Sequence, residues 1–170
     1  MVVLETERLQ LRRFTLDDAA FILRLLNDPG FVRYIGDKGV RDLDAARGYL
    51  QAGPMASYER HGFGLWCVGL RGEDTAIGMA GLIRRDYLDD MDIGYAFLPE
   101  YAGMGYALEA ASAVMAHARG VLDAPRVLAI VDEDNASSIR LLEKLGFQGN
   151  GVVRAPGSER DVRLFVADSE

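Results

Sequence analysis

The chain has 170 residues, of which 49% are apolar and 26% charged, as in a single globular domain and unlike a disordered chain. Nineteen basic residues stand against 26 acidic ones, and the net charge of -7 argues against nucleic-acid binding and favours an amine-bearing substrate. The single cysteine forms no internal disulfide, and the sequence shows neither a signal peptide nor an apolar run of about 18 residues. We therefore expect a cytoplasmic protein that binds no membrane.

Apolar periodicity separates strands from helices along the chain. Leu9 and Leu11 alternate with polar neighbours, as in a half-buried strand, whereas Ile22, Leu25 and Leu26 recur at helical spacing. In chain order the sequence predicts strand 8–13, helix 15–26, turn 27–30, helix 42–53, strands 65–70, 75–83 and 91–98, helix 106–119, strand 127–131, helix 135–145, and strands 147–154 and 162–166. This order, β-α-α-β-β-β-α-β-α-β-β, predicts an α+β domain with a mixed sheet.

Capping and turn residues place the boundaries of these elements. Thr15, followed three residues later by Asp18, has the spacing of a capping box, and residues 27–30 (Asn-Asp-Pro-Gly) are typical of a turn. Pro54 should end or kink the second helix, and the sequence leaves open whether the helix resumes through Tyr58. The short connections between the central strands predict an antiparallel meander.

A glycine-bearing loop joins the third central strand to the helix at 106–119. Gly103 and Gly105 would let backbone N–H groups approach a ligand, and the first turn of the helix would attract a phosphate or pyrophosphate. An ordinary strand-to-helix turn that needs glycine for its geometry explains the glycines equally well. The chain has no P-loop sequence, and the third glycine of a dinucleotide fingerprint is missing, so neither of those sites is predicted.

Two polar residues follow the strand at 127–131. If Asn135 caps the next helix, Ser138 lies in the first turn, where N–H dipoles favour negative charge. For each residue alone, a purely structural capping role is the other interpretation.

Four ordered blocks of sequence together resemble the GNAT superfamily of acyl-CoA-dependent N-acetyltransferases. They are most similar to the branch that acetylates the N-termini of ribosomal proteins. The blocks are residues 4–13, 77–82, 92–110 and 135–147, so the resemblance spans nearly the whole chain. It implies one N-acetyltransferase domain over 1–170, with a GNAT-like mixed, mostly antiparallel central sheet flanked by helices.

The resemblance also implies which residues contact acetyl-CoA, the acyl donor. The strand at Phe97 and Leu98 would pair through its backbone with the pantetheine arm, and Asn135 would bond the donor nearby. Ser138 matches a position that contacts the donor and assists the departing thiolate. Ala102 stands where the family usually has Gln or Arg and this branch often has Trp. Backbone N–H groups would hold the pyrophosphate at Gly103, Met104, Gly105, Tyr106 and Ala107.

The implied reaction is direct attack of a neutral amine on the thioester within a ternary complex. The amine would belong to a protein N-terminus or to a small molecule. Asp92 is the expected general base, with a merely solvated carboxylate as the other interpretation, and Glu59 is the reserve candidate. A backbone N–H near Phe97 would stabilise the oxyanion.

A non-catalytic acyl-CoA-binding module or sensor is the alternative function. It is favoured by Ala102 and by the lack of a tyrosine acid between residues 135 and 147. No metal ion is expected, and both a monomer and a homodimer are compatible with the sequence.

Overall fold

One eight-stranded sheet organises residues 1–168, the part of the chain that the computed structural model describes. The strand order is β1-β2-β3-β4-β5-β6-β8-β7. Neighbouring strands pair antiparallel except β5 and β6, which pair in parallel. The expected mixed, mostly antiparallel sheet and the central meander are confirmed. The strands are β1 (Val2–Glu5), β2 (Leu9–Arg12), β3 (Leu65–Leu70), β4 (Ala76–Ile83), β5 (Asp92–Phe97), β6 (Arg126–Val131), β7 (Gln148–Val153) and β8 (Val162–Asp168).

The N-terminal strand is split into two, which corrects the single strand expected at 8–13. The N–H of Thr6 donates to the carbonyl of Leu9 at 2.9 Å and closes the turn between β1 and β2. The sequence did not predict β1 because residues 2–5 do not alternate in polarity. This strand lies at the edge of the sheet and has no fully buried residue.

The helical segment after β2 begins as expected but continues differently. Thr15 and Asp18 form the predicted capping box at the start of η1 (Leu16–Asp18), and α1 (Ala19–Leu26) follows directly. Residues 27–30 end that helix, but they also start another, α2 (Pro29–Tyr34), which corrects the predicted turn. Asp28 caps α2 by accepting from the first N–H groups, and proline suits the first helical position because it needs no donor there.

The open question at Pro54 is answered by a π-helical turn. The helix α3 (Leu43–Leu50) runs into η2 (Gln51–Met55), which contains Pro54, and the chain then continues as α4 (Ala56–His61). Tyr58 therefore does lie in a helix. Its hydroxyl accepts from the N–H of Phe14 at 3.1 Å and donates to the carbonyl of Leu65, which ties α4 to the sheet.

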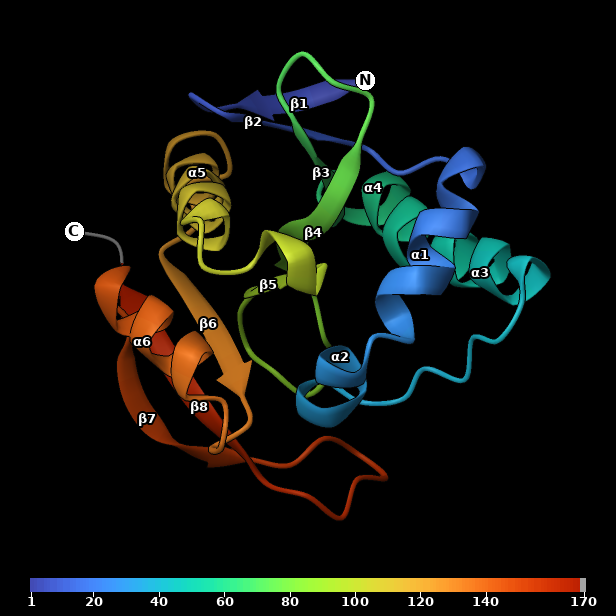
Figure 1. The fold of residues 1–170 in the computed structure, drawn as a ribbon. Coiled ribbons are helices and arrows are strands. Elements are labelled where there is room, and N and C mark those ends of the chain that lie inside the picture. The colour runs from blue at the N-terminus through green and yellow to red at the C-terminus, as the bar shows by residue number, and fades with distance from the viewer. Residues whose placement is uncertain (169–170) are drawn as a thin grey trace.

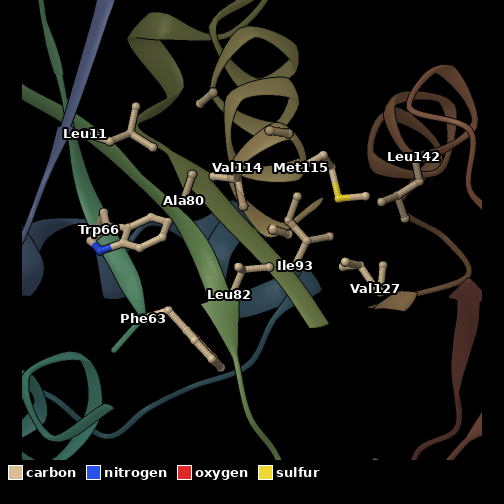
Figure 2. Packing of buried hydrophobic residues seen from close by; sticks show 14 of the residues in the cluster. Leu11, Phe63, Trp66, Ala80, Leu82, Ile93, Val114, Met115, Val127 and Leu142 are labelled. Atoms are coloured by element: carbon tan, nitrogen blue, oxygen red, sulfur yellow. The ribbon is translucent and has the colours of Figure 1, made fainter. Parts of the chain in front are cut away.

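Helices cover both faces of the sheet and leave a hydrophobic core on each side. The helices α1 and α3 lie on one face, while α5 (Tyr106–Gly120) and α6 (Ala136–Lys144) lie on the other (Figure 1). Figure 2 shows Val114 and Met115 of α5 above the strand residues Ala80 and Ile93. No helix within residues 1–168 has both the length and the apolar character needed to cross a bilayer.

Candidate active site

The two parallel strands at the middle of the sheet separate almost at once. Among the described residues, β5 and β6 share one register pair, Asp92 with Leu128, and the N–H of Leu128 donates to the carbonyl of Met91 at 2.9 Å. The facing edges beyond this pair have no strand partner. The resulting wedge opens into a cavity of about 920 Å³ that reaches both faces of the sheet.

The backbone of β5 presents alternate residues to the wedge. The N–H of Leu98 donates to Ile77 of the β4 side at 2.9 Å, and its carbonyl accepts from Tyr101 at 3.0 Å. Because successive backbone groups point to opposite edges of a strand, those of Tyr95 and Phe97 face the wedge. Phe97 is therefore placed as expected for pairing with an extended ligand. Leu98 is placed differently, since both its backbone groups are bonded within the protein and its buried side chain does not line the cavity.

The loop before α5 forms a cradle of backbone N–H groups. Gly103 and Gly105 have φ angles of 77° and 81°, and Gly105 precedes the first turn of α5 with no side chain capping it. Met104 does not line the cavity; the residue is 53% exposed, and its carbonyl accepts from Nη1 of Arg8. The cavity is lined here by Ala102, Gly103, Gly105, Tyr106 and Ala107.

The first turn of α6 faces this cradle across the wedge. Asn135 caps the helix by accepting from the N–H of Ser138 at 3.3 Å, and both residues line the cavity. The capping role is thus real, and it fixes Ser138 in the first turn. The hydroxyl of Ser138 lies 2.7 Å from that of Tyr95, which reaches across from β5. Burial raises the pKa of the Tyr95 phenol, so the phenol stays protonated near neutral pH.

Tyr95 is a residue of this cavity that the sequence did not single out. The alternation of β5 places Ile93, Tyr95 and Phe97 on one face, and of these three the sequence predicted a role at the site for Phe97 alone. The family pattern places a tyrosine acid between residues 135 and 147, where this chain has none. Two features of the sequence could have indicated Tyr95, namely the alternation of β5 and the expected neighbouring strand β6. Together they bring this face of β5 towards the helix that follows β6.

Asp92 is a buried carboxylate at the closed end of the wedge. Its side chain is 1% exposed, and Oδ1 accepts from Nε of Arg85 at 2.9 Å. Burial raises its pKa to about 6 even though the Arg85 charge and hydrogen bond act in the opposite direction. Its second oxygen, Oδ2, is buried without a hydrogen-bond partner within residues 1–168. The interpretation of Asp92 as a solvated carboxylate is therefore wrong.

Glu59 does not share this environment. It is exposed on α4 and does not line the cavity, so the structure brings Asp92, Tyr95 and Ser138 to one cavity and leaves Glu59 outside it.

Comparisons with known proteins agree with this geometry. A model of the acetyltransferase (GNAT) domain matches residues 8–148. The uncharacterized N-acetyltransferase YoaA of Bacillus subtilis is 33% identical over 153 residues, which are 89% of this chain and 86% of that protein. The structure of RimL, a ribosomal L7/L12 alpha-N-protein acetyltransferase in complex with coenzyme A, has a TM-score of 0.83 at 17% identity and covers 99% of this chain and 98% of its own.

A second solved structure carries the same fold with another type of acceptor in its name. It is a chimera of the Vibrio cholerae spermidine N-acetyltransferase SpeG and hSSAT, with a TM-score of 0.76 at 19% identity over 94% of this chain and 95% of its own. Protein and small-molecule amines are thus both named as acceptors among these neighbours. Members of the matched family use acetyl-CoA to acetylate amino groups, and the relative is named as an enzyme, which favours catalysis over a non-catalytic module. The chain belongs to the GNAT family and is an N-acetyltransferase.

Proposed function

We propose that this enzyme transfers an acetyl group from acetyl-CoA to a primary amine by direct attack within a ternary complex. One observation carries the proposal: the wedge between β5 and β6 connects an uncapped helix N-terminus to a buried carboxylate that lacks a partner for one oxygen. The acceptor amine belongs to a protein N-terminus or to a small molecule.

The residues at the wedge fit the acyl donor. The glycines at 103 and 105 leave the first N–H groups of α5 open, which suits a pyrophosphate. A Cβ at Gly103 would meet nothing within 4 Å, so space remains above this backbone. Phe97 offers backbone groups to a pantetheine arm, and Asn135 lines the same channel. With Ala102 in place of the family's Gln, Arg or Trp, the cradle lacks a larger side chain but keeps all its backbone N–H donors.

Asp92 supplies the base in this scheme. An ammonium has no free electron pair, so the attacking amine must first lose a proton. A carboxylate with a pKa of about 6 is ionised near neutral pH and is more basic than an ordinary aspartate. Arg85 holds Oδ1, which leaves Oδ2 to take the proton, directly or through one water molecule.

The charges that develop during the transfer form midway along the wedge. As the C–N bond forms, a backbone N–H on the free edge of β5, at Tyr95 or near Phe97, stabilises the oxyanion of the tetrahedral intermediate. As the C–S bond breaks, the hydroxyl of Ser138 donates a proton or a hydrogen bond to the departing thiolate. Tyr95 restores the hydrogen bond or proton to Ser138, because its phenol is buried, protonated and 2.7 Å away. Tyr95 therefore acts through Ser138.

The first experiment is thermal unfolding with and without saturating acetyl-CoA, with NADH as the control ligand. A ligand that binds the native state alone, at a hundredfold excess over Kd, adds about 2.7 kcal/mol to the free energy of unfolding. A shift with acetyl-CoA, absent with NADH, supports donor binding and is followed by an assay of amine-dependent thiol release. No shift with acetyl-CoA would overturn the proposal.

A further inference from the structure

The charges that line the cavity have the opposite sign to the charge of the whole chain. The protein carries a net charge of -7, yet the acidic residues lining the cavity within residues 1–168 are Asp92 and Asp132. Asp132 is paired with Arg160, and Asp92 with Arg85. The basic residues that line the cavity are Lys38, Arg60, Arg84, Arg85, Arg140 and Lys144.

Four of these basic residues fall into two groups at different ends of β5. Arg140 and Lys144 belong to α6, which faces the phosphate cradle. Arg84 and Arg85 follow Ile83, whose register partner is Asp92. Asp92 and Phe97 are five residues apart along β5, or about 17 Å in an extended strand. The cations at the Asp92 end are therefore remote from the pyrophosphate, and the donor does not explain them.

Two cations near the Asp92 end have no ion-pair partner among the described residues. They are Lys38, in the segment between α2 and α3 and close enough to Arg85 to feel its charge, and Arg84. Lys38 is an exposed residue, but partial burial of its ammonium, followed by the nearby charge of Arg85, lowers its pKa. Because Arg85 is paired with Asp92, Lys38 and Arg84 are the cations here without an ion pair among the described residues, and an anion between them would offset their charge.

An apolar wall completes this end of the cavity. Phe31, Tyr34 and Ile35 come from α2 and the residue that ends it, and Tyr49 comes from α3. Burial raises the pKa of Tyr49, so its phenol is a neutral hydrogen-bond donor near Arg85. The pocket therefore offers cations, an apolar surface and the base to one acceptor molecule.

We infer that the acceptor of this acetyltransferase is an amine that also carries a carboxylate, held by Lys38 and Arg84 while the amine faces Asp92. This inference rests on the proposed function. The net acidity of the chain, which favours a cationic acceptor, does not describe this pocket. The same chemistry is found in a free amino acid and in a peptide whose N-terminal residues are acidic, whereas a polyamine would meet repulsion.

Matched acceptors test the charge without changing the rest of the molecule. After acetyl-CoA binding has been established by thermal unfolding, thiol release is measured with L-phenylalanine, L-phenylalaninamide and phenethylamine. A second arm compares C-terminally amidated Ala-Phe-Asp-Asp with Ala-Phe-Asn-Asn. We expect kcat/KM to be on the order of tenfold higher for the carboxylate member in at least one arm, because a hydrogen bond to a charged group has that worth. The arm that responds identifies the source of the carboxylate.

Variants show whether Lys38 is responsible. Lys38→Met should remove most of the preference and Lys38→Arg should keep it. Arg47→Met, which removes an exposed charge of α3 outside the cavity, should leave it unchanged. Thermal unfolding of each variant shows that it is folded.

Several results would overturn the inference. One is equal or better turnover of the amide, the Asn peptide or phenethylamine, and another is a preference that survives Lys38→Met. If no acceptor is turned over, the CoA-loaded protein is titrated with the same compounds, and no added thermal shift from the carboxylate members would also overturn it. In these cases acetyl-CoA binding persists. Failure of the proposed function is different, because acetyl-CoA itself then produces no shift.

Discussion

Replacing Asp92 by Asn tests the assignment of the general base. The change keeps the size of a side chain that is 1% exposed but removes its ability to accept a proton. Loss of a general base lowers kcat about 10²- to 10⁴-fold. Because the pKa of Asp92 is about 6, its ionised fraction in the native enzyme falls about tenfold between about pH 7 and about pH 5. We therefore expect an acid limb in the pH profile of kcat/KM that the Asp92→Asn variant lacks.

The same group should also affect folding, with a predictable sign. The pKa of Asp92 is raised on folding, so between about pH 4 and about pH 6 the native chain binds more protons at this site than the unfolded chain. The contribution of Asp92 to the free energy of unfolding therefore decreases as pH rises through this window. Urea unfolding at several pH values should show this slope in the native protein and a smaller one in Asp92→Asn.

A matched replacement separates the two carboxylate candidates. Glu59→Gln removes an acidic group from the exposed side of α4 and should leave both kcat and the acid limb unchanged. An unchanged rate in Asp92→Asn, or an acid limb that persists in it, would refute the assignment. Loss of activity in Glu59→Gln instead would transfer the role to the reserve candidate.

Three further predictions concern the cradle, the leaving-group end and the core. Gly105→Ala forces a residue with a Cβ to φ 81° and places that Cβ 3.3 Å from Arg8, so it should cost about 1–2 kcal/mol and reduce the thermal shift with acetyl-CoA. Gly120→Ala, where nothing lies within 4 Å, should do neither. Tyr95→Phe and Ser138→Ala should each lower kcat at unchanged thermal stability. Because the two residues act as a unit, the double variant should have a kcat little lower than that of the poorer single variant. Losses that add in the double variant would show that the two residues act independently. Leu82→Ala, at a fully buried position, should lower the free energy of unfolding in urea by about 2–5 kcal/mol.

Local sequence patterns predicted most of the scaffold because they are properties of neighbouring residues. The capping box at Thr15 and Asp18, the meander, and the cap at Asn135 all depend on residues within one turn or one hairpin. The helix α2, which starts at Pro29, was not predicted, for a related reason. The same Asp-Pro pair that ends one helix is a good start for another, and sequence alone did not decide between these roles.

The site was harder to predict because it is assembled between segments that are distant in sequence. The backbone groups of Leu98 are bonded because of which edge of β5 pairs with β4. A register shift of one residue would have bonded those of Phe97 instead and left those of Leu98 facing the wedge. The contact between Tyr95 and Ser138 spans 43 positions of sequence. The charge of the cavity depends on which few charged residues line it. The net charge of -7 is a sum over the whole chain and does not show this.

The separation of β5 from β6 links these features to catalysis. An intact parallel pair would use the backbone groups of Tyr95 and Phe97 for the sheet itself, and no channel would cross it. Once the strands diverge after Asp92, the freed edge can bind an extended donor while the sheet remains closed beside Asp92. The two ends of one short strand then differ sharply, with a buried carboxylate and unbalanced cations at one and open N–H groups at the other. Such a strand can hold two different substrates in line, and direct transfer without a covalent enzyme intermediate requires that arrangement.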